Sequence, residues 1–150
     1  QEKLPVESLT VMVQKEAAIR ICAAPGTRAC GAVSVAVQYY SQPQILFDVP
    51  RDCFFPAPNV DSAVIRLNIR TEPPVKLETE EKQFFKLVKA AFGQRRKTVL
   101  NSLSTGLGKS KEELSAALQH AGIAPTARAE QLTMEQFGTL CNLLFPNKAQ

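Results

Sequence analysis

The chain has 150 residues, 45% of them hydrophobic and 21% charged, which is the composition of an ordinary globular protein of one domain or of one and a half small ones. No run approaches the roughly 18 uncharged apolar residues of a membrane-spanning helix, and no metal site is expected, because the four cysteines lack CxxC spacing and there is a single histidine. The net charge of +4 lies entirely after residue 73. The first 73 residues carry seven Lys/Arg and seven Asp/Glu, whereas the remaining residues carry eleven Lys/Arg and seven Asp/Glu. This excess of positive charge indicates a polyanionic partner for the second half.

The first 70 residues predict alternating strands and helices. In chain order they predict a strand at 9–13, helices at 14–24 and 32–40, and strands at 44–49 and 62–69. The last two strands should pair as a long hairpin across the loop between them. A sheet of three strands leaves edges and one face uncovered. The pattern therefore predicts the closing part of a larger α/β sheet whose opening strands precede Gln1.

The second half of the chain predicts a small helical bundle. Residues 70–75 are polar and contain two prolines, so they predict a linker. Four helices are expected after it, at 78–92, 94–103, 110–121 and 134–145. Ser110 and Thr133 are the expected N-caps of the last two, each followed three residues on by Glu or Gln as in a capping box.

An aromatic–proline segment lies between the two strands of the expected hairpin. Phe54 and Phe55 precede two prolines, Pro56 and Pro58, which fix their own φ and favour extended neighbours, so the loop should be rigid. A rigid loop that presents an aromatic ring suits stacking against a nucleic-acid base. The alternative is a β-turn that buries the Phe pair.

Three adjacent cations, Arg95, Arg96 and Lys97, open the helix expected at 94–103. Positive charge at a helix start opposes the helix dipole, and a phosphate backbone would compensate it. Gln94, Asn101 and Ser102 add polar donors that would share or flank the same face. The alternative is a solvated helix face.

Arg128 precedes the last helix, in the sequence Arg-Ala-Glu. It is a second candidate for nucleic-acid contact, and an ion pair made by Arg128 or Glu130 with a neighbour explains the pattern equally well.

The scattered cysteines lie on otherwise apolar segments and fit a reducing cytoplasm, where cysteine acts as a small hydrophobe.

Five segments occur in the order found in one family: 13–18 (VQKEAA), 34–40 (SVAVQYY), 54–63 (FFPAPNVDSA), 92–98 (FGQRRKT) and 128–130 (RAE). Together they resemble the bacterial small-subunit (16S) ribosomal RNA adenine dimethyltransferases (the KsgA type, related to the Erm resistance methylases). The resemblance extends from about Leu9 to Leu144.

The resemblance implies an α/β fold: residues 1–72 form the C-terminal part of a Rossmann-like, S-adenosylmethionine-dependent methyltransferase sheet, and residues 73–150 form a small all-α rRNA-binding domain. The family dimethylates two adjacent adenines near the 3′ end of small-subunit rRNA, with a role in maturation of the small ribosomal subunit. The expected partner is therefore small-subunit rRNA, and a monomeric, cytoplasmic protein is expected.

The resemblance also assigns roles to residues. Phe54 is expected to form one wall of the pocket for a flipped-out adenine, with Pro56 and Pro58 holding that wall rigid. Arg95, Arg96 and Lys97 would contact rRNA phosphates, and Arg128 is a weaker candidate for such a contact. Phe55 stands at a variable position of the motif and is expected to pack.

Several parts of the family pattern are absent from this chain. The glycine-rich cofactor loop, the acidic residue for the cofactor ribose and the Asn-Leu-Pro-Tyr-like motif are expected upstream of Gln1, so no cofactor-binding residue is expected here. Asn59 stands where the family often has lysine, which removes one candidate phosphate contact. The chain alone is expected to be inactive.

Two other functions fit parts of the sequence. One is a non-catalytic RNA-binding or ribosome-assembly module that has lost methyl transfer. The other is a helix-turn-helix DNA binder in residues 78–145, against which the glycine-rich break after Leu103 and the lack of an evident recognition helix both count.

Overall fold

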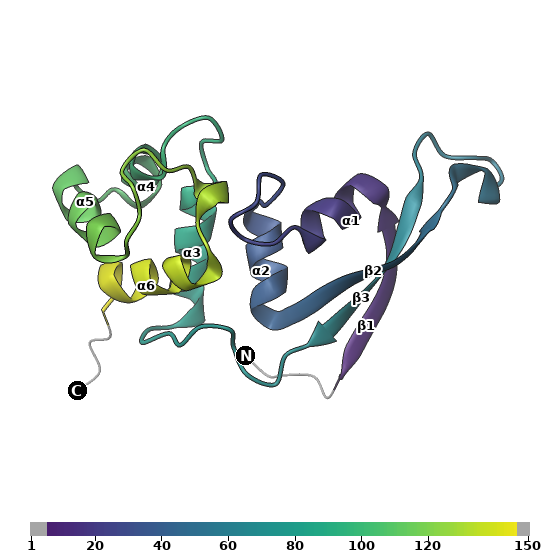
Figure 1. Ribbon diagram of the computed structural model, residues 1–150, viewed down its shortest axis with the longest axis horizontal. Helices are drawn as coiled ribbons and strands as arrows, with labels where there is room; N and C mark the ends of the chain where they lie inside the picture. The colour runs from purple at the N-terminus through teal and green to yellow at the C-terminus, as the bar shows by residue number, and fades with distance from the viewer. Residues whose placement is uncertain (1–5, 147–150) are drawn as a thin grey trace.

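The computed structural model describes residues 6–146 of the chain. Its elements are β1 (Ser8–Gln14), α1 (Lys15–Cys22), α2 (Ala32–Tyr40), β2 (Ser41–Val49), η1 (Arg51–Cys53), β3 (Ser62–Ile69), α3 (Glu81–Ala91), α4 (Val99–Leu107), α5 (Lys111–His120), η2 (Ala129–Gln131) and α6 (Met134–Leu144). An α/β part up to β3 is followed by a helical part from α3 onward, in the predicted order (Figure 1). Between residues 6 and 146, no helix has the length and apolar character needed to cross a bilayer.

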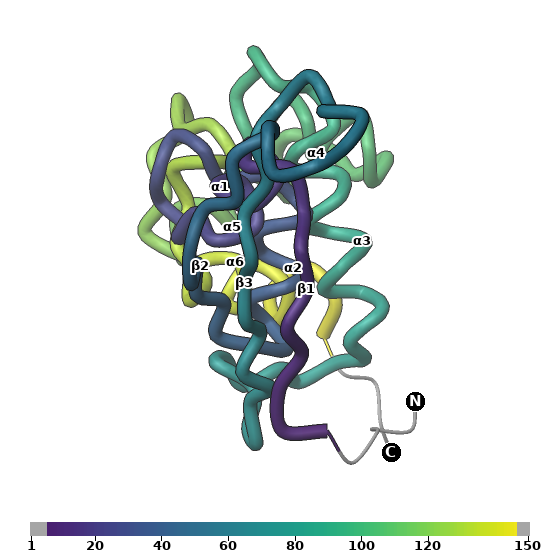
Figure 2. The backbone as a smooth tube through the Cα atoms, turned by 90° about the vertical axis from the view of Figure 1, so that its right-hand side faces the viewer, coloured from purple at the N-terminus to yellow at the C-terminus, as the bar shows by residue number. Residues whose placement is uncertain are grey.

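The three strands form one antiparallel sheet with β3 in the centre and β1 and β2 at its edges. β2 and β3 pair from Ser41–Ile69 to Val49–Ser62, so the predicted hairpin is confirmed. The α-helices α1 to α6 lie on one side of the sheet (Figures 1 and 2). On that side Ile65 is buried close to α1.

The opposite face of the sheet is open within the described residues. Met12 and Phe47 both pair with Val64 and are 51% and 57% exposed, respectively. Since strand residues alternate between faces, these three side chains share the face that no helix covers. The uncovered face and free edges expected from the sequence are both present.

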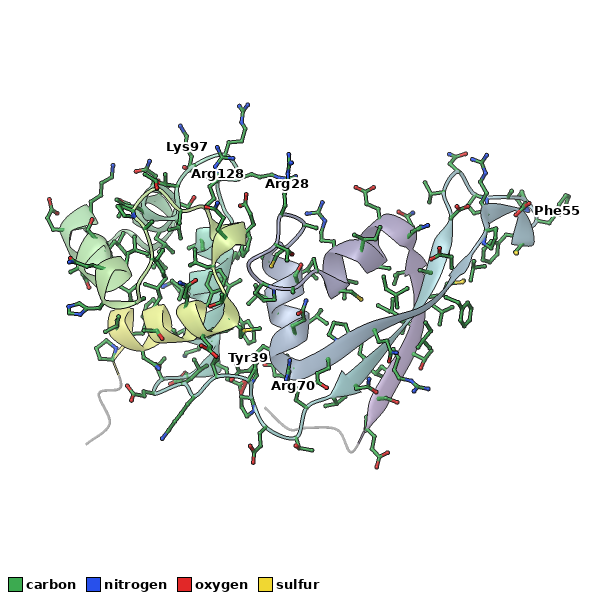
Figure 3. The ribbon with its side chains drawn as sticks, in the orientation of Figure 1. Arg28, Tyr39, Phe55, Arg70, Lys97 and Arg128 are labelled. Atoms are coloured by element: carbon green, nitrogen blue, oxygen red, sulfur yellow. The ribbon has the colours of Figure 1, made fainter. Side chains whose placement is uncertain are left out.

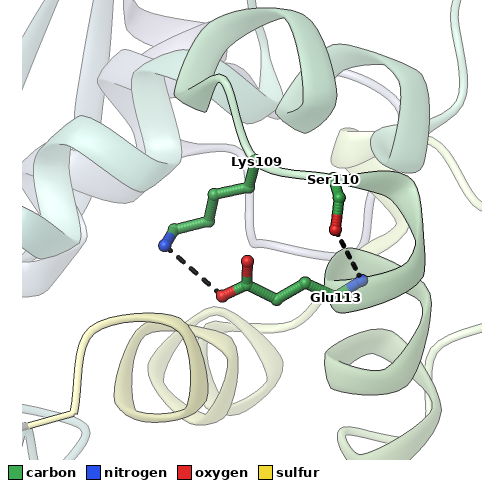
Figure 4. A network of polar contacts seen from close by, with 3 residues as sticks. All are labelled: Lys109, Ser110 and Glu113. Carbon is green, nitrogen blue, oxygen red and sulfur yellow. Dashed lines mark hydrogen bonds and ion pairs between the residues drawn. The ribbon is translucent and has the colours of Figure 1, made fainter.

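The helix starts of the helical part follow from local hydrogen bonds. Thr133 Oγ1 accepts from the backbone N–H of Gln136 at 3.1 Å and the Gln136 side chain accepts from the Thr133 N–H at 3.0 Å, so the predicted capping box is confirmed. Ser110 Oγ caps α5 through the N–H of Glu113, whose carboxylate also pairs with Lys109 at 3.4 Å (Figure 4).

The main hydrophobic core is built by both parts of the chain. Its centre is helical, with Phe84 and Phe137 fully buried. Cys30, Val35 and Tyr39, from α2 and the loop before it, belong to the same cluster. The Tyr39 ring lies 5.1 Å from the ring of Phe84. The α/β part and the helical part are therefore packed as one body through this core.

The segment expected to be a linker is bound to α6. The Asn142 side chain donates to the carbonyl of Lys76 at 3.0 Å and accepts from the N–H of Glu78 at 2.7 Å. Val75 packs so closely on α6 that a Cβ added at Gly138 would lie 3.0 Å from it. A larger residue at this position would require Val75 to shift by a few tenths of an ångström, so glycine favours the close approach of the connection, which runs along the lower edge of the molecule in Figure 1.

Candidate functional site

The aromatic–proline loop, residues 50–61, projects beyond the end of the sheet where the β2–β3 hairpin turns (Figure 1). Its two ends are joined, because the N–H of Arg51 donates to Asp61 Oδ1 at 2.9 Å and the Arg51 guanidinium donates to the carbonyl of Asn59 at 3.3 Å. The short helix η1 adds a turn that ends with a bond from Phe54 N–H to the carbonyl of Arg51. The backbone that presents Phe54 is thus held by bonds at both ends of the loop.

The two phenylalanines of the loop differ in exposure. Phe54 is half-buried, whereas Phe55 is fully exposed at 101%. The expectation that Phe55 packs is wrong, and so is the alternative of a buried Phe pair, because the loop extends past the sheet and residues 6–146 offer nothing to cover it (Figure 3). Pro56 and Pro58 are exposed beside it.

An open pocket of about 540 Å³ lies against the base of this loop. It is lined by residues from the end of β1, from α1 and from the loop: Gln14, Lys15, Glu16, Ile19, Arg51, Asn59, Val60 and Asp61. The N–H of Lys15, the first residue of α1, donates to the carbonyl of Asp61 at 3.0 Å, and its ammonium pairs with Asp48 at 3.1 Å. The bond between Arg51 and Asp61 was not predicted from the sequence. Its only signal there is that the two residues flank the prolines at a spacing of ten.

The exposure of this loop predicts an order of cysteine labelling. At pH 8 iodoacetamide should modify the exposed Cys53 first, whereas Cys30 and Cys141 should react last. Burial raises the pKa of Cys30, and that of Cys141 to about 11, so both remain thiols at this pH and the reactive thiolate is scarce. Peptide mapping over time measures the order, and Cys53→Ser should remove the fast step. Equal rates for Cys53 and Cys141 would contradict this fold.

The three adjacent cations lie in a loop and do not open a helix. The expected helix at 94–103 begins instead at Val99, where the Thr98 side chain accepts from the N–H of Asn101 and caps α4. Arg95, Arg96 and Lys97 precede this cap and are exposed. They therefore still lie at the positive end of a helix, with side chains free to point into solvent.

One of the polar residues expected beside these cations, Ser102, has a structural role. Ser102 is 1% exposed, and its hydroxyl donates to the carbonyl of Gln94 at 3.2 Å, which ties the cationic loop (residues 93–98) to α4. A turn bond from Lys97 N–H to the same carbonyl, at 3.1 Å, shapes the loop further. Ser102 is thus unavailable as a contact residue, and the loop is a fixed platform for its three charges.

Arg128 lies at the start of η2 and is exposed. The ion pairs among residues 6–146 are Lys15–Asp48, Lys82–Glu80 and Lys109–Glu113, and none of them involves Arg128 or Glu130. The turn is held instead by the Gln131 side chain, which accepts from the N–H of Arg128 at 2.8 Å. The ion-pair alternative is wrong for this part of the chain.

Figure 3 places Arg128 and Lys97 on one edge of the molecule, together with Arg28. Arg28 lies in the loop between α1 and α2 and is exposed. Arg28 has no predicted role, because the first half of the chain is neutral overall. Arg70 lies toward the opposite edge in the same view, whereas Tyr39 is 3% exposed and lies in the core.

The α/β part, from residue 6 to β3, contains no Gly-x-Gly turn of the kind that the resemblance implies for S-adenosylmethionine. Gly31 is the N-cap of α2 and has no neighbouring Gly-x-Gly turn. The cofactor loop that the resemblance implies is, in contrast, rich in glycine. The pocket beside the aromatic–proline loop has no aromatic lining. Residues 6–146 also contain no cluster of three His, Cys, Asp or Glu side chains suited to a metal ion.

Comparison with known proteins finds a family match and close relatives. Residues 1–145 match the family model described as ribosomal RNA adenine dimethylase. The chain is 50% identical over 148 residues to ribosomal RNA small subunit methyltransferase A of Geobacillus thermodenitrificans, covering 97% of this chain and 50% of that protein. It is 53% identical over 145 residues to the protein of the same name from Alkaliphilus oremlandii, covering 96% and 50%. The chain spans about half the length of these curated relatives.

Two solved structures share the fold. A dimethyladenosine transferase from Plasmodium falciparum matches 89% of this chain and 55% of its own, with a TM-score of 0.69 at 23% identity. The 23S rRNA methyltransferase ErmE matches 92% of this chain and 55% of its own, with a TM-score of 0.63 at 27% identity. The arrangement of a three-stranded sheet followed by a helical part is thus found in known methyltransferases.

Proposed function

The chain belongs to the ribosomal RNA adenine dimethylase family, and on that premise we propose that it supplies the target-base and RNA-binding residues of an enzyme that dimethylates two adjacent adenines near the 3′ end of small-subunit rRNA. The methyl donor is S-adenosylmethionine, which supplies an activated methyl group when bound. The reaction belongs to maturation of the small ribosomal subunit in the cytoplasm.

The observation that carries this proposal is the aromatic–proline loop. An adenine amine inside a helix is out of reach, so the base must leave the stack and be held outside it. Phe54 offers a half-exposed ring on a backbone that Arg51 and Asp61 hold closed. Stacking on that ring would orient the exocyclic amine, and a fixed wall avoids the entropy cost of ordering a loop at each turnover.

The cationic residues supply the second half of the proposal. Arg95, Arg96, Lys97 and, more weakly, Arg128 would bind rRNA phosphates, for which the forked donors of arginine are suited. Residues 1–72 would be the closing portion of the catalytic domain and residues 73–150 the rRNA-binding domain. The cofactor site would lie in the half of the family's length that this chain does not span.

Methyl transfer by two forms of the protein tests the proposal. A full-length protein that contains this chain should transfer labelled methyl groups to small-subunit rRNA, with dimethyladenosine as the product detected by mass spectrometry. The 150-residue chain alone should bind that rRNA, should not bind S-adenosylmethionine tightly and should give no product. Methyl transfer by the chain alone would overturn the assignment of the cofactor site. Binding of rRNA without transfer by the full-length protein would favour the non-catalytic ribosome-assembly alternative.

A further inference from the structure

Three loops that are far apart in sequence meet along the edge that carries Arg28, Lys97 and Arg128 (Figure 3). The N–H of Val99, next to the cationic loop, donates to the carbonyl of Ala127 at 2.7 Å, which joins the cationic loop to the turn at 127–131. The third loop, residues 24–31, reaches the start of α6 just after this turn, since a Cβ at Gly26 would lie 3.9 Å from the side chain of Thr133, the N-cap of α6. The three loops therefore lie side by side across the boundary between the α/β part and the helical part, with the turn at 127–131 in the middle.

The loop that carries Arg28 is fixed at both ends. Thr27 donates from its hydroxyl to the carbonyl of Ala24 at 2.6 Å, and the N–H of Cys30 donates to the carbonyl of Thr27 at 3.1 Å. Cys30, two residues after Arg28, is 5% exposed in the core shared with the helices. Arg28 therefore projects from a backbone whose position is set relative to the helical part.

The charge of the three loops is uncompensated. They carry five cations, Arg28, Arg95, Arg96, Lys97 and Arg128, and one carboxylate, Glu130. Within the described part of the chain none of these cations makes a side-chain hydrogen bond or ion pair, whereas three lysines elsewhere in it are paired. Five exposed like charges held on fixed loops repel one another, and the partner that relieves such repulsion is a polyanion.

We propose that Arg28 binds a phosphate of the same RNA that Arg128 and the cationic loop bind, so that the RNA backbone crosses from the helical part onto the α/β part. This inference rests on the proposed function and extends it to a residue of the neutral first half. The edge leads from the helices past Arg28 toward the end of the molecule where Phe55 lies (Figure 3). The α/β part thereby shares in holding the RNA beside the loop that presents Phe54.

Salt-dependent binding of the 150-residue chain tests this role. The probe is an RNA fragment from the 3′ end of small-subunit rRNA with two adjacent adenines. Arg28→Gln should weaken binding several-fold and reduce the slope of log K against log salt by roughly 0.7 to 0.9, the value for one lost phosphate contact. Arg28→Lys, which keeps the charge, should restore the slope.

Lys76→Gln is the matched control. Lys76 is exposed on the segment that follows the opposite edge, and only its backbone carbonyl is bonded, so the substitution removes one charge without a contact. The RNA affinity of Lys76→Gln and its slope of log K against log salt should equal those of the unsubstituted 150-residue chain. An Arg28→Gln variant that behaves like Lys76→Gln would overturn the inference, and if replacing the cationic loop still weakens binding, the proposed function stands. If the 150-residue chain without substitutions does not bind this RNA, both the inference about Arg28 and the proposed function fail.

Discussion

Replacing Phe54 by alanine in the full-length protein should lower kcat for adenine dimethylation by about 10- to 100-fold, because base–aromatic stacking contributes about 1–3 kcal/mol per base. The affinity for rRNA should change by less than about threefold, since phosphate contacts supply most of the binding free energy. Single-turnover methyl transfer and filter binding measure the two effects separately.

Two further variants distinguish stacking from packing. Phe54→Tyr keeps a planar ring and should retain most of the rate, whereas Phe54→Leu keeps apolar bulk without a ring and should behave like alanine. Phe55→Ala is the matched control on the same loop, because Phe55 is fully exposed and lies outside the proposed wall. An equal loss of binding and rate in Phe54→Ala would mean that the ring is structural.

Replacing Arg95, Arg96 and Lys97 together by glutamine should weaken rRNA binding by roughly 10- to 100-fold at low salt and reduce the salt slope by about 2 to 3, since each phosphate contact releases about 0.7 to 0.9 of a counterion. The three side chains are exposed and precede the cap of α4, so the fold should be unchanged. Circular dichroism checks the fold, and binding over a range of salt concentrations gives the slope.

A triple variant of equal charge change provides the control. Lys76, Lys86 and Lys111 are exposed and lie outside the three loops of the cationic edge, so their replacement by glutamine should leave the slope nearly unchanged. An unchanged slope in the first triple variant would refute the phosphate assignment. Binding of duplex DNA as tightly as rRNA at matched salt would favour the DNA-binding alternative.

Periodicity and capping residues were enough to predict most elements of this fold. The run of branched residues in 62–69 predicted a strand, and the Thr133–Gln136 pair predicted the start of α6. The helix at 94–103 was wrong because Arg, Lys and Gln favour helices. At that point the cap at Thr98 and the bond from Ser102 to Gln94 hold the chain in a loop.

The candidate site was only partly predictable, because its remaining features are tertiary. Phe55 was expected to pack because it stands at a variable position of the family motif, yet its exposure depends on how far the hairpin extends beyond the sheet. Arg28 lies in a half of the chain with no net charge. Its place on the edge that it shares with Lys97 and Arg128 depends on the approach of Gly26 to Thr133, which is 107 residues away in sequence. A count of charge along the chain cannot reveal a surface made by folding.

The shared core has a consequence for how a target is chosen. Cys30, Val35 and Tyr39 lock the α/β part to the helices, so the distance between the cationic edge and the aromatic loop is set by a packed interior and not by a hinge. If the proposed function holds, we expect the enzyme to select an adenine by the distance between that base and the bound phosphates, with little dependence on the neighbouring sequence.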